Sequence, residues 1–328
     1  MNRRRILYLA VGVGVAGRAL PLWAQNTTAS LRRVGVLAPS TRAREEVTLK
    51  PFFDEMRRLG WIEGQSIAYD RAYADDRHQD LPRLAAELVA RKPELIYAPP
   101  QIAAVAARQA TRTIPIVFAT GIDPVRAGLV SSLGRPGGNA TGVISVVDSL
   151  TPKRVELLRE ILPGAKRIGL LGDPTDPRLS MDRNALAPVA SALGLTIAFA
   201  EASNPAEFDA AVAKLIGQSV DAIIAITSIS SNMRTRLIEL ANLKHVPVVG
   251  ALAETAEAGG LFSYAASIPR QIGRSAQVVD KVLNGAKPAD IPVEQPTRFD
   301  LVFNLTTAKA LGIEIPPRLF FTATDVIE

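Results

Sequence analysis

The sequence predicts an α/β protein with two similar doubly wound lobes, whose parallel sheets are joined by a hinge of several crossings. Three observations predict this fold class: short strands of the buried type alternate with helical segments, the alternation starts again after about residue 150, and one more strand–helix–strand run follows the second half. Strands joined through helices need a crossover and therefore run parallel. A chain of 328 residues is also long for one hydrophobic core.

The first half is predicted to be βαβαβαβ. Apolar residues at helical spacing between Leu49 and Leu59, closed by Gly60, indicate the first helix. Strands are expected at 33–38, 66–74, 95–98 and 114–119, and helices at 48–59, 81–90 and 102–110. A short helix over 124–133, a turn over 135–139 and a strand over 140–146 lead out of this lobe.

The second half begins at Thr151-Pro152, a pattern typical of a helix start. Strands are expected at 167–171, 195–200, 222–227 and 247–250, and helices at 151–162, 183–193, 207–216 and 232–244. The last elements are a strand over 261–265, a helix over 269–283 and a strand over 299–304. We expect residues 31–147 with about 265–292 in the amino-terminal lobe, and 148–264 with about 293–328 in the carboxy-terminal lobe. Asp148, at the crossing, is expected to make a hinge hydrogen bond.

Residues 1–24 are predicted to be a removable signal peptide. Three arginines precede an apolar run that is too short to span a bilayer, and Ala24 ends a segment suited to cleavage. Removing them takes away four arginines and no acids, so the formal charge falls from +6 to +2 (6 − 4). The sequence therefore predicts a periplasmic protein that does not bind nucleic acid, since no basic stripe with interleaved aromatics remains.

Several kinds of chemistry are excluded by composition and motifs. The chain has no cysteine, so it has no disulfide framework, thiolate metal site or lipid-modified cysteine. No GxGxxG follows the first strand, and GxSxG, HExxH and P-loop motifs are absent. The two histidines, His78 and His245, lie in different predicted elements. We therefore expect neither an enzyme nor a bound cofactor or metal.

Residues 114–143, IPIVFATGIDPVRAGLVSSLGRPGGNATGV, resemble the signature of a group of ABC-transporter substrate-binding proteins with the type I periplasmic-binding fold. Residues 52–67, 259–267 with 279–304, and 307–317 resemble the same family. The resemblance implies a monomeric two-lobed receptor that captures a small solute between its lobes and delivers it to a membrane permease. Some members of the group resemble binders of tryptophan, tyrosine or phenylalanine, so an amino acid is the predicted solute.

The candidate ligand-binding residues follow strands, because open parallel sheets take ligands at the carboxyl ends of their strands. Hydroxyls and amides suit a carboxylate, and a carboxylate such as that of Asp123 suits an ammonium group. The first lobe offers Ser40, Gln101, Thr120, Asp123 and Thr141. The second lobe offers Asp173, Thr227 and Ser228 at strand ends, and Tyr264 near the expected last crossing.

Each candidate has a structural alternative, and other ligands stay open. Asp123 precedes a proline and suits a turn cap equally well, and Gln101, Ser40 and Ser228 suit helix starts. A sugar site would use aromatic faces, but Trp61 is expected to pack at a helix end. A periplasmic sensory protein that signals to a membrane receptor is a further alternative, whereas a repressor would need a helix-turn-helix where the signal peptide stands.

Overall fold

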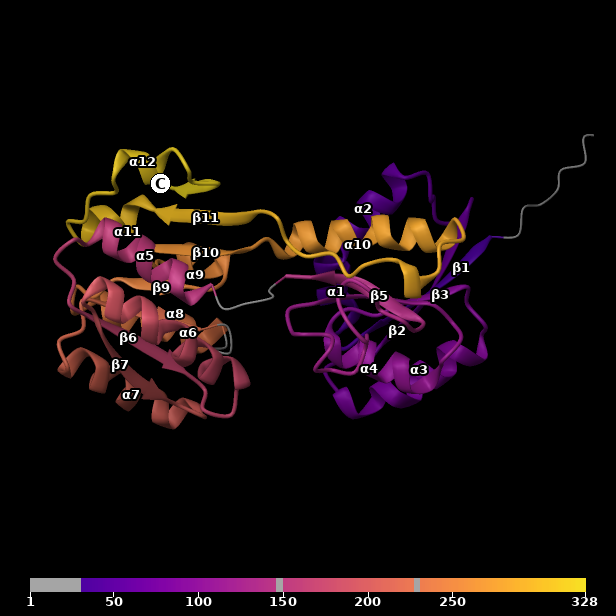
Figure 1. Cartoon of the computed structure of the whole chain (residues 1–328), viewed down its shortest axis with the longest axis horizontal. Helices are drawn as coiled ribbons and strands as arrows, with labels where there is room; N and C mark the ends of the chain where they lie inside the picture. Colours follow the sequence, from indigo (N-terminus) through magenta and orange to yellow (C-terminus); the bar gives the residue numbers. More distant parts are fainter. Residues whose placement is uncertain (1–30, 146–149, 227–230) are drawn as a thin grey trace, which may run out of the picture. The chain divides into compact units, whose positions relative to one another are not determined.

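The computed structural model describes residues 31–145, 150–226 and 231–328. It contains two sheets, each flanked by helices on both faces (Figure 1). The predicted fold class, two α/β lobes with parallel sheets joined by several crossings, is confirmed. The predicted signal peptide and Asp148 lie outside the described residues.

The first sheet is wholly parallel and has the order β2-β1-β3-β4-β5. Its strands are β1 (Arg32–Ala38), β2 (Ile67–Tyr73), β3 (Leu95–Tyr97), β4 (Ile116–Thr120) and β5 (Ala140–Ile144). Side chains alternate between two cores, so Val36 packs with one face and Leu37 with the other. Both faces are buried, as expected of a doubly wound sheet.

The helices of this lobe lie on both faces of the sheet. They are α1 (Arg42–Thr48), α2 (Lys50–Arg58), α3 (Leu81–Ala90), α4 (Gln101–Ala110) and α10 (Ile268–Leu283). Helix α10 packs against α2, β4 and β5, whereas α3 and α4 pack against each other and share the core of the opposite face. The helix expected at 48–59 is preceded by α1, and the two are separated at Leu49 because Pro51 stands in the first turn of α2.

The helix expected over 124–133 is wrong, because these residues form turns. Gly128 has a φ of +68°, which is the left-handed region and is incompatible with a continuing right-handed helix. The amide of Leu129 donates to the carbonyl of Pro124, five residues earlier, at 2.9 Å. The apolar spacing that suggested a helix instead buries Leu129 and Val130 against the core.

Tyr97 and Phe52 form the centre of the core between α2, α10 and the first sheet. Their rings stack with centroids 4.0 Å apart, and both side chains are fully buried. The Tyr97 hydroxyl lies 2.8 Å from Ser275 Oγ on α10, and Ser275 also donates to the carbonyl of Ile272. Burial raises the pKa of Tyr97 well above its usual value of 10.

The raised pKa of Tyr97 predicts a loss of stability at alkaline pH. Above about pH 10 the unfolded chain releases this proton while the folded protein keeps it, so rising pH favours unfolding by about 1.4 kcal/mol per pH unit. Tyr97→Phe should remove this contribution, although Tyr69 has a raised pKa as well. Urea unfolding at pH 8, 10 and 11 measures the slope, and equal slopes for both proteins would contradict the assignment.

The second sheet has the order β12-β11-β10-β9-β8-β6-β7. Its pairs are parallel except β10 and β11, which are antiparallel. The strands are β6 (Arg167–Gly172), β7 (Thr196–Glu201), β8 (Ala222–Ala225), β9 (Val248–Gly250), β10 (Phe262–Ala266), β11 (Phe299–Asn304) and β12 (Asp325–Ile327). The antiparallel pair follows from the connection, because the chain returns to this sheet from the side on which β10 ends.

The helices of the second lobe also cover both faces. They are α5 (Thr151–Ile161), α6 (Pro177–Leu193), α7 (Pro205–Gly217), α8 (Ser231–Asn242), α9 (Ala253–Glu257), α11 (Leu305–Ala310) and α12 (Pro317–Phe320). One core joins the α5 and α6 side to the sheet, and another joins the α7 and α8 side. Helix α6 starts six residues before the expected helix and contains Pro188.

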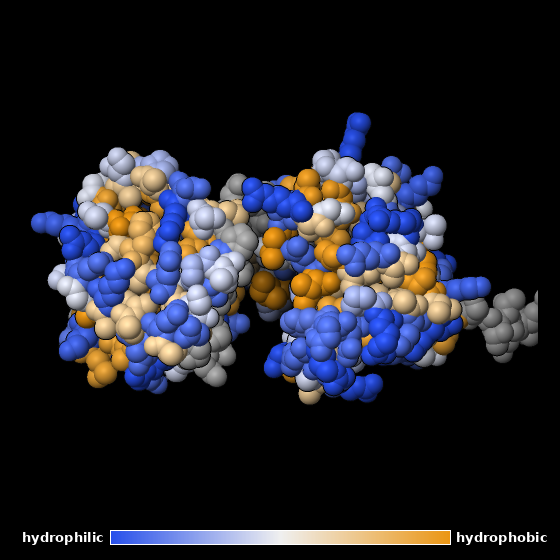
Figure 2. Space-filling model, turned by 90° about the horizontal axis from the view of Figure 1, so that it is seen from below, coloured by the Kyte–Doolittle hydropathy of each residue, from blue (hydrophilic) through white to orange (hydrophobic). Residues whose placement is uncertain are grey.

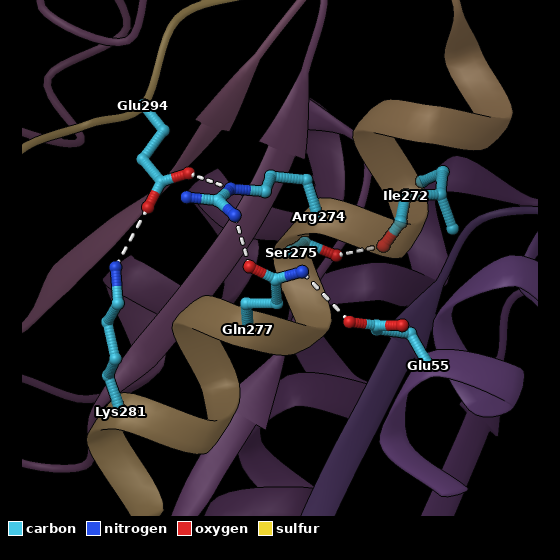
Figure 3. A network of polar contacts seen from close by, with 7 residues as sticks. All are labelled: Glu55, Ile272, Arg274, Ser275, Gln277, Lys281 and Glu294. Carbon is cyan, nitrogen blue, oxygen red and sulfur yellow. Dashed lines mark hydrogen bonds and ion pairs between the residues drawn. The ribbon is translucent and has the colours of Figure 1, made fainter. Parts of the chain in front are cut away.

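The chain passes from the first sheet to the second after β5, back after β10, and again after Glu294; we call these segments the crossings. The side chain of Glu294 bonds Arg274 and Lys281 of α10, and Arg274 in turn bonds Gln277 (Figure 3). Gln277 donates to Glu55 of α2 at 2.8 Å. Burial opposes the ionisation of Glu294, but the bonds from Arg274 and Lys281 outweigh it and lower the pKa of this carboxyl.

Hydrophilic residues cover much of the face drawn in Figure 2, with hydrophobic residues between them. Large exposed apolar side chains come from separate elements, among them Val47, Leu243 and Phe321. Scattered apolar residues of this kind are ordinary on a protein surface. None of the helices in the described ranges is both long and apolar enough to cross a membrane.

Candidate ligand-binding site

The strand order of the first sheet places its topological switch point between β1 and β3. Strands β1 and β3 are neighbours, and the chain continues outward from them in opposite directions. Ligands of open α/β sheets bind at such points, beyond the carboxyl ends of the strands. Ser40 follows β1, Gln101 follows β3 and Thr120 ends β4, so the structure brings these three predicted residues to one edge of the sheet.

Gln101 is the first residue of α4 and carries an acceptor without a partner. Its Oε1 atom is buried and has no hydrogen-bond partner among the residues that the structure describes. A buried polar atom costs about 1–3 kcal/mol when it lacks a hydrogen bond. The atom lies at the edge where the fold takes ligands, so a donor group of a ligand is a natural partner for it.

Asp123 and Thr120 take part in a local turn. Asp123 Oδ1 accepts hydrogen bonds from the amides of Val125 at 2.8 Å and Arg126 at 3.4 Å, and Thr120 Oγ1 accepts from the amide of Ile122 at 3.2 Å. The turn cap that competes with ligand binding is therefore present at Asp123. The second carboxylate oxygen, Oδ2, lies 3.9 Å from the guanidinium of Arg126, at a half-exposed position.

Ser40 lies beside a carboxylate that sequence reasoning missed. Its amide donates to Glu45 Oε1 at 3.2 Å. The helix-start role expected of Ser40 as an alternative is wrong, because the N-cap of α1 is Thr41. Glu45 is buried, and burial raises its pKa against the opposing hydrogen bonds from Ser40. Glu45 belongs to α1, a helix that the apolar pattern did not reveal, so nothing in the sequence pattern placed this carboxylate near β1.

The strand-end position expected for Thr141 is wrong. Thr141 is the second residue of β5, and it pairs with Val117 rather than with the carboxyl end of β4. Its side chain is fully buried, and its hydroxyl donates to the carbonyl of Ile291 at 2.7 Å. Thr141 therefore holds the segment before the last crossing instead of facing the edge.

Residues 133–144, the glycine-rich part of the family-like motif, also hold the segment before the last crossing. The amide of Val293 donates to the carbonyl of Leu133, and the amide of Glu294 donates to that of Gly142. Asn139 Nδ2 donates to the carbonyls of Thr111 and Ile114, which fixes the turn before β5. Residues 133–144 thus bind the chain that returns from α10, and this explains the motif without a ligand.

Replacing Thr141 by Val is expected to lower the free energy of unfolding by about 1–3 kcal/mol, because the buried carbonyl of Ile291 loses a hydrogen bond at constant side-chain shape. Thr141→Ser keeps the hydroxyl and serves as the control. Urea unfolding followed by the fluorescence of Trp61 measures the change. A smaller loss for Val than for Ser would show that the hydroxyl does not stabilise this segment.

The second lobe contributes fewer described candidates. Asp173 follows β6, and its Oδ1 atom accepts from the amide and the hydroxyl of Thr175. Tyr264 lies in β10, half-buried, with its ring centroid 5.7 Å from that of Phe299. Thr227 and Ser228 lie outside the described residues.

A buried arginine of the second lobe was not predicted. Arg154 Nε donates to the carbonyl of Tyr264 at 2.9 Å, and its Nη1 donates to Thr151 Oγ1 at 3.0 Å. Burial lowers the pKa of the guanidinium to about 10, while Asp182 opposes this shift, so Arg154 remains charged at neutral pH. The sequence contained a signal for this residue, since Arg154 falls at helical spacing on the buried face of α5 with Thr151 and Leu158.

Gln271 is another missed residue at the edge of the first sheet. Its buried amide donates to the carbonyls of Thr120 at 2.8 Å and Val143 at 3.2 Å. These bonds join the first turn of α10 to the carboxyl ends of β4 and β5. Gln271 therefore fixes the edge on which Thr120 lies.

Three aromatic side chains that could form a sugar site, those of Tyr69, Tyr97 and Trp61, are engaged in packing. Tyr97 is fully buried against Phe52, and Tyr69 meets Phe53 edge to face with ring centroids 5.0 Å apart. Trp61 donates from Nε1 to Asp280 Oδ1 at 2.9 Å and packs against the core, as expected. Within the described ranges, no group of three or more His, Asp or Glu side chains could hold a metal ion.

A family model described as ABC transporter substrate binding protein matches residues 34–327. Among curated proteins, a tyrosine-binding protein of Clostridioides difficile is 27% identical over 267 residues, which cover 81% of this chain and 76% of that protein.

Two solved structures are similar over nearly the whole chain. One is an ABC domain in complex with L-Trp from Streptococcus pneumonia, with 26% identity, a TM-score of 0.75, and coverage of 91% of this chain and 100% of that one. The other is the ligand-free, open form of a substrate-binding protein with adhesive properties from Clostridium difficile, with 25% identity, a TM-score of 0.77, and coverage of 90% and 99%.

Proposed function

The chain belongs to the family of ABC transporter substrate-binding proteins, and from this premise we propose that it captures an amino acid, with aromatic ones as first candidates. The family consists of binding proteins, so the chain is not an enzyme. Two relatives support the solute class, since one is named for tyrosine and another was solved with L-Trp. Both are similar to this chain along most of its length.

The buried Oε1 atom of Gln101 is the observation that supports an ammonium-bearing solute most directly. It is an acceptor without a described partner at the switch point of the first sheet. Carboxylates at the same edge, Asp123 and Glu45, add the charge that an ammonium group needs. The hydroxyls of Ser40 and Thr120 are donors of the kind that a solute carboxylate accepts from.

Capture is proposed to work as a clamp. The solute binds first to the edge of one lobe, and the crossings then allow the second lobe to close over it. Contacts made only in the closed form shift the population toward that form. Asp173 and Tyr264 are the described residues of the second lobe that we assign to the closed site, together with Thr227 and Ser228.

The biological setting belongs to the same proposal. Residues 1–24 direct export to the periplasm, where the protein acts as a monomer and delivers its solute to an ABC permease of the inner membrane. A protein that starts at Gln25 should remain in the cytoplasm, and cell fractionation measures this. Export of that shortened protein would contradict the signal-peptide assignment.

A thermal-shift screen of the protein from Gln25 onward tests the solute class. A ligand that binds only the folded state raises the melting temperature, by the equivalent of about 2.7 kcal/mol at a concentration of 100 Kd. We expect a rise with L-tryptophan, L-tyrosine or L-phenylalanine and none with glucose, arabinose or uridine. A rise with a sugar or nucleoside alone would overturn the amino-acid proposal while leaving the family assignment in place.

A further inference from the structure

A cavity of about 610 Å³ lies beside β5, away from the switch point between β1 and β3. Its walls are the carboxyl end of β5, the first turns of α10 and residues 294–298 of the last crossing. Its charged lining residues are Arg270, Arg274, Arg298 and Glu294. With three arginines and one carboxylate, the lining carries a formal charge of +2 (3 − 1), and we call it the crossing pocket.

Glu294, the carboxylate of the crossing pocket, is already engaged by two basic side chains. Glu294 already accepts from both Arg274 and Lys281, and Figure 3 shows its two oxygens turned toward these two side chains. Arg274 is further held by Gln277. The Glu294 carboxylate is thus paired with cations of α10, and the bonds of Arg274 fix the orientation of its side chain.

The other two arginines are the donors left for a ligand. Arg298 has an exposed side chain with no hydrogen bond or ion pair to any residue of the described ranges. Arg270 forms an ion pair with Asp300 at 3.1 Å through Nη2, and half of its side chain is exposed. A guanidinium carries five donors, so Arg270 keeps donors for a second acceptor.

The backbone adds to the positive potential of the pocket. Helix α10 has 16 residues and begins at the pocket wall, with Ser267 as its capping residue. The positive end of the helix dipole therefore points toward this space, where it favours anions. Ser145, Ser267 and Thr297 line the same cavity and bring hydroxyl groups.

We propose that the crossing pocket is a second binding site, which takes a small dianion such as inorganic phosphate or a dicarboxylate. Two guanidinium groups match two negative charges, and planar guanidinium forks bind carboxylates and phosphates with paired hydrogen bonds. The volume is in the range usual for small-molecule sites. An anion held between Arg270 and Arg298 would join α10 to the last crossing, and so act on the connection between the sheets.

Titration calorimetry of the protein from Gln25 onward tests this site with two probes, sodium phosphate and succinate, at constant ionic strength set by chloride. We expect saturable binding of one of them and at least about tenfold weaker binding by Arg298→Gln, because a hydrogen bond to a charged group is lost. Arg112→Gln, an exposed arginine that precedes the amino end of β4, should bind like the unchanged protein.

The two probes distinguish the source of the anion, since binding of phosphate alone assigns a phosphate site and binding of succinate alone assigns a dicarboxylate site. Absence of binding by both would overturn the proposal, as would equal binding by Arg298→Gln. Competition between the dianion and the amino acid would also overturn it, because it would place the dianion at the strand-end site. Amino-acid binding is measured separately, so failure of one proposal leaves the other intact.

Discussion

Gly142→Ala is expected to destabilise the first lobe by about 3 kcal/mol or more. A Cβ atom at this position would lie 2.1 Å from the carbonyl oxygen of Phe118 and 2.7 Å from its ring. The obstacle is backbone of the neighbouring strand, so β4 and β5 would have to separate. The amide of Glu294 bonds the carbonyl of Gly142, so the last crossing would be disturbed as well.

Urea unfolding followed by Trp61 fluorescence measures this change, because Trp61 is the one tryptophan left after residue 24 and packs in the first lobe. Gly134→Ala is the matched control, since a Cβ at Gly134 meets nothing within 4 Å. Its effect should stay within about 0.5 kcal/mol. Equal stability of the two variants would show that β4 and β5 do not pair as described.

Asp123→Asn is expected to weaken the binding of an amino acid by about 30-fold or more. The change keeps an oxygen that can accept from the amide of Val125, so the turn stays capped while the charge is lost. Losing one partner of a hydrogen-bonded charge pair costs about 2–5 kcal/mol, and 1.4 kcal/mol corresponds to a factor of ten. Titration calorimetry with the solute found in the thermal screen measures the affinity.

Two further variants make this result interpretable. Asp54→Asn removes a carboxylate from the exposed surface of α2 and should leave the affinity unchanged. Asp123→Ala removes both the charge and the cap, so it should also lower stability by about 1 kcal/mol. Unchanged affinity of Asp123→Asn, with a stability loss only for Asp123→Ala, would assign Asp123 to turn capping alone.

The fold could be predicted because strands buried on both faces and helices with apolar faces leave clear periodic patterns. The strand at Ile116–Thr120 and the helix at Gln101–Ala110 lie within two residues of their predicted bounds. The segment 124–133 was predicted wrongly because Gly128 adopts a left-handed conformation that interrupts a helix, and apolar spacing does not encode this. The antiparallel pairing of β11 depends on the path of the returning chain, which periodicity does not encode.

The site was harder to predict because position after a strand does not say where a side chain points. Gln101 and Thr120 lie at the expected edge, but Thr141, which was expected at a strand end, lies inside β5 and bonds the chain that returns from α10. Glu45 was not predicted as a site residue because its short helix has little apolar periodicity. The unpartnered oxygen of Gln101 became visible only once the burial around it was known.

Titration calorimetry of the protein from Gln25 onward with L-tryptophan, L-tyrosine and L-phenylalanine tests directly whether the protein captures an aromatic amino acid. We expect saturable binding of at least one of them with a stoichiometry of one, and much weaker binding of the analogue that lacks the ammonium group. Binding of none of the three, together with binding of a sugar or nucleoside, would contradict it.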